Sequence, residues 1–537
     1  MSRVKLPQPT RLDRAIGYLF PGVMASRLQQ RVKIERYQAM AGGRGGYDAG
    51  DRERRALRNA RRLQGSADAA LLPVADDLRA LSDDARRNNP LAAGALDTIA
   101  TKVVGRGLQL QASLDRKALG LSEEEARAYE ETFERFWRHL WSRVDFSRRH
   151  HGAQLEYIAK YMMLAHGDVF VVKTGRRDSG DLFNLKIQLI PAARVCNKDR
   201  AADTATLAAG IAFADGVPAK VQIASHYPFD MRFGAQELTW QEVDIWGKKS
   251  GRRNVLHLMM ATDADQTRGV PLLAPVIEAL KQLSDWSYAE LTAAVMNSVF
   301  AIVNKTEGGS EFPETGENAA STSDGLSRLD LTLEAGLVLD GLSPNESIEG
   351  FSATRPNPDF DPFFVSICRQ IAVALGLSFE LLVRHFTASY SASRAALMQV
   401  WEVMLRRRAW FSRAFHQDLY EEMLAEAHEN GLVTLRGWNN PLMREAWCKA
   451  RWVGPAQGQL NPKQEVDAAL AKISGGLSTE EEQTAELCGG DYDANQDQRD
   501  REVARRRQRG ELPPLAAPAA PEPPPADVPE DETREPS

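Results

Sequence analysis

Residues 360–410 read FDPFFVSICRQIAVALGLSFELLVRHFTASYSASRAALMQVWEVMLRRRAW, and this stretch decides how the chain is organised. Its apolar residues recur at steps of three and four up to Leu375, which places them on one face of a helix. A polar segment rich in hydroxyl groups follows, and the helical period resumes from Leu397 to Leu419. The pattern predicts two helices joined by a cationic loop, which can contact a polyanion without recognising a particular sequence.

The length of 537 residues exceeds that of one ordinary core, so two or more structural regions are expected. Hydrophobic residues make up 43% of the chain, which is typical of a soluble globular protein. No apolar run is long enough to cross a bilayer, because residues 293–303, the best candidate, include Asn297 and Ser298. The first residues lead into no apolar signal-peptide core, so secretion by that route is not expected.

The charge of the chain is unevenly distributed. Lys and Arg total 67 against 73 Asp and Glu, a net charge of −6, yet basic residues dominate before Gly65 and acidic residues dominate the far C-terminus. Proteins that bind DNA tightly usually have a strong basic excess, because each neutralised phosphate adds affinity through counterion release. The balance argues against high-affinity DNA binding and permits weak, sliding contact.

The sequence contains no motif typical of an enzyme or of a metal site. The four cysteines are far apart and lack Cys-x-x-Cys spacing, so we expect reduced thiols, no metal and no disulfide framework. Neither a phosphate-binding loop nor a Gly-x-Ser-x-Gly elbow occurs. The pairs His150-His151 and Asp263-x-Asp265 are better explained as surface and loop residues than as ligands. We therefore expect no catalytic residues, no cofactor and no enzyme activity, and a hydrolase with an unrecognised site stays open as an alternative.

Local signals divide the chain into helical and β-rich parts. Asn89-Pro90 separates two predicted helices, and Ser122 begins another with a capping box. Strands are predicted at 168–173, 185–191, 219–223, 243–246 and 255–258, and helices at 74–88, 90–104, 272–303 and 360–375 and again from Asn461 and Ser478. Between the long helices, residues 304–357 are polar and rich in Gly, Ser and Pro, which is typical of an insertion.

Several sequence blocks, in a fixed order along the chain, resemble one protein family. The blocks are Leu78–Ala95 with its continuation to Leu108, Gln266–Pro275, Asn357–Phe360, Tyr390–Leu397, and Trp452–Pro455 with Asn461-Pro462. On these blocks the chain resembles the phage portal proteins of the lambda type over most of residues 30–505. The motif residues to which we assign a structural role are Asn89, Pro90, Gly94, Arg268, Gly269, Pro271, Tyr390, Ser391 and Arg394.

The resemblance implies an α+β portal-protein fold with a mixed α/β wing, two long stem helices, a small clip insertion and a helical crown region. Mapped onto this chain, the parts are a basic N-terminal arm (1–65), the wing (66–270), a first stem helix (271–303), the clip (304–357), a second stem helix (358–376), a tunnel loop (377–394), wing core and crown helices (395–510), and a proline-rich acidic tail without a packed core (511–537).

The resemblance also implies partners and a location. It implies a homo-oligomeric ring, usually of twelve subunits, at one vertex of a viral capsid, through which double-stranded DNA enters and leaves without sequence specificity. The terminase large subunit, the major capsid or scaffold proteins and the head-completion proteins are the other implied partners, and no membrane is involved. The ring would assemble in the host cytoplasm and stay in the virion. A monomeric assembly adaptor or scaffold is the alternative from another class.

Five residues are candidates for contacting DNA in the channel: Arg384, His385, Thr387, Ser389 and Lys281. Isolated cationic and hydroxyl side chains would contact phosphates and carry no base specificity. The other interpretation, that Arg384 and Lys281 pair with neighbouring carboxylates, stays open.

Overall fold

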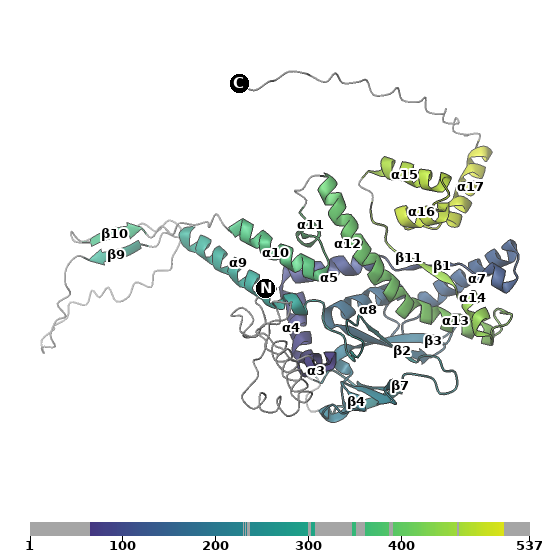
Figure 1. The fold of residues 1–537 in the computed structure, drawn as a ribbon, viewed down its shortest axis with the longest axis horizontal. Coiled ribbons are helices and arrows are strands. Elements are labelled where there is room, and N and C mark those ends of the chain that lie inside the picture. Colours follow the sequence, from purple (N-terminus) through teal and green to yellow (C-terminus); the bar gives the residue numbers. More distant parts are fainter. Residues whose placement is uncertain are drawn as a thin grey trace, which may run out of the picture. The chain divides into compact units, whose positions relative to one another are not determined.

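The computed structural model describes residues 65–228, 230, 232, 237–298, 302–306, 346–350, 360–385, 390–458 and 461–509. The chain divides into two units, Met1–Ser66 and Ala67–Ser537, and every element named below belongs to the second. In the described part of this unit, helices combine with four small antiparallel sheets, so the α+β class is confirmed (Figure 1). The basic arm, except Gly65, and the tail at 511–537 lie outside the described residues.

The helices account for most of the regular structure. They are α3 Ala67–Leu71, α4 Ala75–Asn88, α5 Pro90–Val103, α6 Arg116–Leu119, α7 Glu123–Trp141, α8 Gly152–His166, α9 Ile277–Ser298, α10 Phe360–Leu375, α11 Phe379–Val383, α12 Tyr390–Phe411, α13 Asp418–Glu429, α14 Pro441–Trp447, α15 Pro462–Ser474, α16 Glu480–Cys488 and α17 Tyr492–Gln508. A π-helical segment, Ser412–Gln417, joins α12 to α13. Among the residues described, no helix is both long and apolar enough to span a membrane.

The strands form short antiparallel sheets. They are β1 Gln109–Ala112, β2 Asp168–Gly175, β3 Leu185–Pro191, β4 Leu207–Ala208, β5 Ile211–Ala214, β6 Val217–Ala224, β7 Trp240–Asp244, β8 Val255–Met259, β9 Ile302–Thr306, β10 Glu346–Gly350 and β11 Ala450–Val453. The order β3-β2-β8 makes one sheet and β4-β5-β6-β7 another, while β1 pairs with β11 and β9 with β10. Val171 at the centre of β2 lies opposite Leu189 of β3 and Leu256 of β8.

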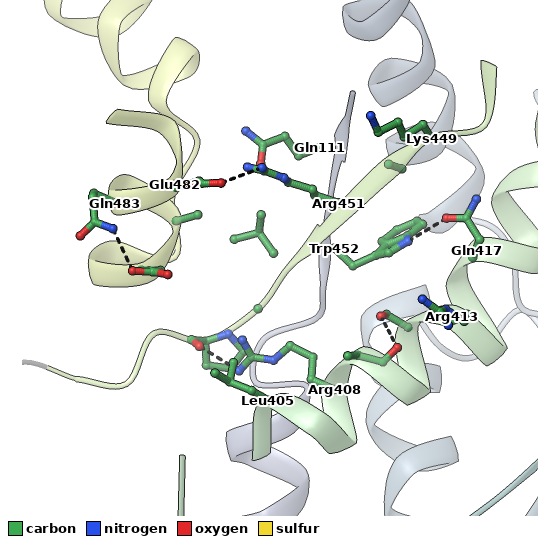
Figure 2. Close-up of a pocket in the computed structure, with 18 of the residues that line it drawn as sticks. Gln111, Leu405, Arg408, Arg413, Gln417, Lys449, Arg451, Trp452, Glu482 and Gln483 are labelled. Atoms are coloured by element: carbon green, nitrogen blue, oxygen red, sulfur yellow. Dashed lines mark hydrogen bonds and ion pairs between the residues drawn. The ribbon is translucent and has the colours of Figure 1, made fainter. Parts of the chain in front are cut away.

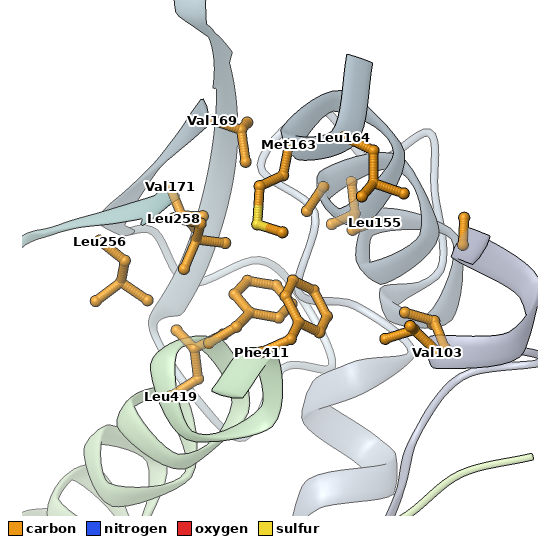
Figure 3. Packing of buried hydrophobic residues seen from close by; sticks show 14 of the residues in the cluster. Val103, Leu155, Met163, Leu164, Val169, Val171, Leu256, Leu258, Phe411 and Leu419 are labelled. Carbon is orange, nitrogen blue, oxygen red and sulfur yellow. The ribbon is translucent and has the colours of Figure 1, made fainter. Parts of the chain in front are cut away.

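The main core forms where α8 and the α12–α13 segment meet one face of the β3-β2-β8 sheet. Phe411 and Leu419 belong to one buried cluster with Val171 of the sheet and Leu155 of α8, and Figure 3 labels all four side chains. Alternate residues of β2 point to opposite faces, so Phe170 joins a second cluster with Val221 of the neighbouring sheet. Burial of each such side chain stabilises the fold by about 1.5–3 kcal/mol.

Two predicted helix starts are confirmed at the level of single hydrogen bonds. The side chain of Asn89 accepts a hydrogen bond from Ala92 N at 3.0 Å, and Pro90 follows at the first helical position. Asn89 also donates through Nδ2 to Ser284 Oγ at 2.8 Å, which fixes the α4–α5 corner against α9. Ser122 and Glu125 form the reciprocal capping box that begins α7.

The predicted helix over 272–303 is wrong at both ends. Pro275 cannot donate a backbone hydrogen bond, and residues 274–276 form a 3₁₀ turn before α9 begins at Ile277. At the other end α9 stops at Ser298, and residues 302 and 303 belong to β9, paired with Gly350 and Glu349 of β10. The strand predicted at 243–246 is shifted, because β7 ends at Asp244.

The pair α9 and α10 lies side by side (Figure 1), with Trp286 stacked on Phe360 at a ring-centroid distance of 4.6 Å. Leu280 at the start of α9 is buried, whereas Tyr288 and Leu291 further along are 72% and 62% exposed. The apolar positions of α9 therefore divide into a packed half and an exposed half.

Candidate functional site

The segment predicted as a continuous loop over 377–394 is partly helical. Ser378 Oγ accepts a hydrogen bond from Leu381 N at 3.3 Å and caps the short helix α11, which ends at Val383 with Arg384 as its C-cap. Arg384 adopts the left-handed conformation with φ 56°, and the next helix begins at Tyr390, four residues before the predicted loop ends. The loop prediction is corrected accordingly: within the described residues, Ser378 and residues 390–394 belong to helix termini.

The two candidate channel cations each have a carboxylate neighbour within the single chain. An Arg384 guanidinium nitrogen lies 3.5 Å from Asp97 Oδ2 of α5, with both side chains more than half exposed. On α9, Lys281 pairs with Asp285 at 2.9 Å, and this hydrogen bond raises the pKa of the lysine, which keeps it protonated. Both pairs are open to solvent, so the carboxylates screen the cations without enclosing them.

Of the other three channel candidates, the structure describes only His385. His385 is exposed and its backbone N–H donates to Glu380 O at 3.2 Å, which closes the end of α11. Thr387 and Ser389 lie outside the described residues. Of the five candidates, Arg384 and His385 are adjacent, whereas Lys281 lies on a different helix.

A buried ionic cluster is centred on Asp168, at the start of β2. Its carboxylate accepts from Arg268 Nε at 2.6 Å and from a second Arg268 nitrogen at 3.1 Å, from Gly269 N at 3.1 Å, and from His257 Nε2 at 3.0 Å. An Arg79 nitrogen of α4 lies 3.8 Å away. Burial raises the pKa of Asp168, but the positive charge of Arg268 and the bonds from its neighbours outweigh it and hold that pKa well below its ordinary value.

The same arginine connects the two neighbouring sheets. Arg268 is 1% exposed and donates to the carbonyl oxygens of Ala192 at 2.9 Å, Val195 at 2.9 Å and Ala209 at 2.7 Å. Next to it, Gly269 passes so close to Gly167 that a Cβ on Gly269 would lie 2.0 Å from the Gly167 carbonyl oxygen. We call Asp168, Arg268, His257 and Arg79 the Asp168 cluster, and its bonds make it a structural joint between distant segments.

A second buried ionic cluster lies between α8 and the π-helical segment. His416 Nε2 is 2.7 Å from Glu156 Oε1, and both side chains are fully buried, while Glu156 Oε2 accepts from Leu108 N at 2.8 Å. One turn along α8, Lys160 is fully buried with its Nζ over the Phe411 ring, and within the described residues this Nζ has no hydrogen-bond partner. Burial lowers the pKa of Lys160 to about 7, and nearby Arg407 adds to the shift. Lys160, Arg407, Glu156 and His416 form the Lys160 cluster, which no sequence signal indicated.

A cavity of about 2030 Å³ separates α12 from the C-terminal helices α15 and α16. Leu405 and Arg408 of α12 line one wall, β11 contributes Arg451 and Trp452, and α16 contributes Gln483 (Figure 2). The lining is chemically mixed. Arg451 pairs with Glu482 across the cavity at 3.0 Å, and Arg408 donates to Val103 O and Pro455 O at 2.9 and 2.8 Å. The cavity joins segments far apart in the sequence, so periodicity could not have located it.

Comparison with known proteins identifies the family. The sequence profile described as phage portal protein, lambda family, matches residues 53–408. The chain belongs to the lambda family of phage portal proteins. The portal protein of Escherichia phage N15 is 28% identical over 518 residues, covering 91% of this chain and 94% of that protein, and portal protein B of Escherichia phage lambda is 27% identical over 478 residues, covering 85% and 88%.

Solved structures of a gene transfer agent particle are also similar to this portal-family chain. Its native neck with C12 symmetry has a TM-score of 0.40 at 14% identity, covering 80% of this chain and 97% of that one. Its empty neck with C6 symmetry has a TM-score of 0.41 at 15% identity, covering 80% and 96%. The profile match and the portal relatives from phages N15 and lambda confirm the resemblance found in the sequence at the level of the family, which is a structural rather than a known enzymatic one.

The portal-family motif residues lie at several separate places in the structure. Asn89 and Pro90 form the α4–α5 corner, and Arg268 and Gly269 lie in the Asp168 cluster, with Leu272 N after Pro271 donating to Leu164 O at 2.8 Å. Tyr390 and Ser391 begin α12, and Arg394 lies 4.0 Å from Glu465 of α15. A Cβ on Gly94 would meet open space, so nothing in the structure explains that glycine. Within the described residues, no group of three or more His, Cys, Asp or Glu side chains is arranged to hold a metal ion.

Proposed function

We propose that this chain assembles into a ring, of twelve copies, at one capsid vertex and that double-stranded DNA passes through the ring during packaging and ejection. The observation that carries the proposal is family membership over residues 53–408, together with portal relatives that align over most of the chain. The ring would belong to the virion and assemble in the host cytoplasm.

Exposed apolar residues on the α9–α10 pair support a ring. Tyr288 and Leu291 lie three residues apart on α9, and Phe363 and Val373 of α10 are 51% and 79% exposed. Scattered exposed apolar side chains are ordinary, but here they lie on two helices that already pack on each other. In a ring each copy has two neighbours, and helices packed side by side would cover these residues.

The charge of the chain supports passage rather than tight binding. A net charge of −6 per copy gives a ring of twelve a charge of about −72, which disfavours wrapping of a polyanion. Arg384 and Lys281, each beside a carboxylate, would then make brief phosphate contacts.

One consequence is that deletion of 384–389 should release or block DNA without abolishing rings, and unchanged packaging and retention would refute a role for this loop.

The proposed parts follow the family resemblance. Residues 66–270 would form the wing, α9 and α10 the stem helices, 304–357 the clip that binds the terminase large subunit, and 395–510 the wing core and crown. Scaffold or major capsid proteins and head-completion proteins are the other proposed partners. The tunnel loop would lie within 377–394, in the part that the helices α11 and α12 leave between them.

Negative-stain electron microscopy with native mass measurement tests the ring. Rings with a central hole that admits duplex DNA are expected, and Leu291→Glu should disperse them because it places a charge in an apolar contact. The matched control is Val217→Glu, which changes an exposed apolar residue on β6 and should leave rings intact. A monomer that persists when the chain is co-expressed with capsid proteins would favour the assembly-adaptor alternative and overturn the ring.

A further inference from the structure

The last helix, α17, has one face covered by arginines. Six arginines occur between residues 499 and 509, and all are exposed: Arg499, Arg501, Arg505, Arg506, Arg507 and Arg509. At about 100° per residue, five of them, all but Arg507, fall within about 160° of the helix circumference. Asp493, Asp497 and Asp500 fall together on the other side. We call the five clustered side chains the arginine face.

The two sides of α17 have different partners. On the acidic side, Asp497 lies 3.8 Å from Arg127 of α7, and at the start of the helix Asp491 accepts from Ala494 N at 3.1 Å. Arg501 bonds only its own helix, donating to Asp497 O at 3.1 Å. Among the described residues, no carboxylate lies within ion-pair distance of Arg499, Arg505 or Arg506. The three aspartates therefore lie on the other side of the helix, whereas Glu502 falls among the arginines and accepts from Gln498 Nε2 at 3.0 Å. Within the described residues, most of the arginine charge is unpaired.

We propose that the arginine face of α17 binds the phosphate backbone of duplex DNA. Guanidinium groups suit phosphate because their planar fork can donate two hydrogen bonds, and such contacts carry no base specificity. The face extends over about 15 Å of helix, long enough to contact several phosphates. It lies outside the residues matched by the family profile and apart from the proposed channel residues. The inference rests on the proposed function only for the presence of DNA at the ring.

The acidic tail that follows α17 is a possible competitor. Residues 510–537 contain seven acids and one arginine, and a tethered segment has an effective concentration in the millimolar range. Its charge is nevertheless sparse, about one acid per four residues, whereas duplex DNA carries one charge per about 1.7 Å of axis. The higher charge density favours DNA as the occupant.

The test measures binding of the full chain to a fluorescent duplex of mixed sequence across a salt series. The variant replaces Arg499, Arg505, Arg506 and Arg509 by glutamine. The matched control replaces four exposed cations elsewhere, Arg135, Arg138, Lys248 and Lys249, by glutamine, so that both proteins lose the same charge. Each lost phosphate contact lowers the slope of log affinity against log salt by about 0.9, so the variant should lose about 3 to 4 units of slope and at least about tenfold in affinity, and the control little.

Three outcomes overturn the proposal. Equal losses of DNA affinity in the variant and the control would show that only net charge matters. Unchanged DNA binding in the variant would show that the arginine face does not contact DNA. Binding that appears only after truncation following Arg509 would make the acidic tail the occupant of the face. Microscopy of the same samples separates this result from the proposed function, because rings that bind DNA without the arginine face leave the portal assignment intact, whereas binding to the face can be measured even if no ring forms.

Discussion

The Asp168 cluster and the Lys160 cluster are both buried and both charged, but they differ in how the charge at their centre is paired. In the Asp168 cluster, the carboxylate and Arg268 satisfy each other and three backbone carbonyls. In the Lys160 cluster, Lys160 Nζ has an aromatic ring and no hydrogen-bond acceptor among the described residues. The first cluster joins distant segments of the chain. In the second, the unpaired buried charge of Lys160 destabilises the contact between α8 and the π-helical segment.

Loss of Arg268 should produce the largest effect. Arg268→Ala leaves Asp168 buried and without its main partner, which typically destabilises a protein by about 3–5 kcal/mol. Arg268→Lys should recover only part of this, because an ammonium group cannot replace the planar fork. The urea midpoint of unfolding, followed by tryptophan fluorescence, measures the change, and a midpoint equal to that of the unmodified chain would show that the cluster is dispensable.

Removing the charge of Lys160 should have the opposite effect and raise the free energy of unfolding. The pKa of Lys160 is lowered from about 10.4 in an unfolded chain to about 7 in the fold, so the unfolded state binds more protons between these values and stability rises with pH there. Below pH 7 the folded state carries the full cost of the buried charge, on the order of 4 kcal/mol. Lys160→Met should therefore stabilise the protein most at pH 6 to 7 and progressively less toward pH 10.

A second lysine, whose side chain is 7% exposed, is the matched control. Lys173 of β2 pairs with Asp418 at 2.5 Å and Glu422 at 3.3 Å, so Lys173→Met should destabilise at neutral pH rather than stabilise. Parallel urea titrations at pH 6.5 and 9.5 compare the two substitutions. A destabilised Lys160→Met protein at pH 6.5 would mean that the ammonium group has an acceptor in solution.

The sequence could predict one of these clusters in part and the other not at all. Arg268 and Gly269 lie in a recognisable family block, but their partner Asp168 is about a hundred residues away and only the fold brings it near. Lys160 and His416 have no local signature, because a π-helical segment is set by tertiary packing rather than by periodicity.

Local rules worked best where a single side chain decides the structure. Asn89 and Ser122 end or begin helices as predicted, since each cap is made within four residues. The loop at 377–394 was overestimated because Ser378, an N-cap residue, was interpreted as part of a polar break. The α9 prediction failed at its C-terminal end because Ile302 and Val303 continue the apolar pattern but belong to a strand.

The corner at Asn89 should show a smaller effect than either buried cluster. Asn89→Ala removes a cap and the bond to Ser284, and caps contribute about 0.5–2 kcal/mol. Asn461→Ala removes a cap of α15 whose bond to Gln464 N is long, at 3.5 Å, and which has no comparable bond to another helix among the residues that the structure describes. The first substitution should therefore shift the urea midpoint more than the second. Equal shifts would show that the bond between Asn89 and Ser284 adds nothing measurable to stability.

The exposed ion pair of Arg384 and Asp97 should contribute less to stability than either buried cluster or the corner at Asn89. Exposed ion pairs contribute about 0–1 kcal/mol, so Arg384→Ala should leave the urea midpoint almost unchanged where Arg268→Ala shifts it strongly. If Arg384 contacts DNA in the channel, the same substitution should lower the amount of DNA packaged or retained per particle, and Asp97→Asn, which frees the arginine, should not. A large stability loss from Arg384→Ala would assign this residue to the scaffold. Normal stability together with normal packaging would exclude it from both roles.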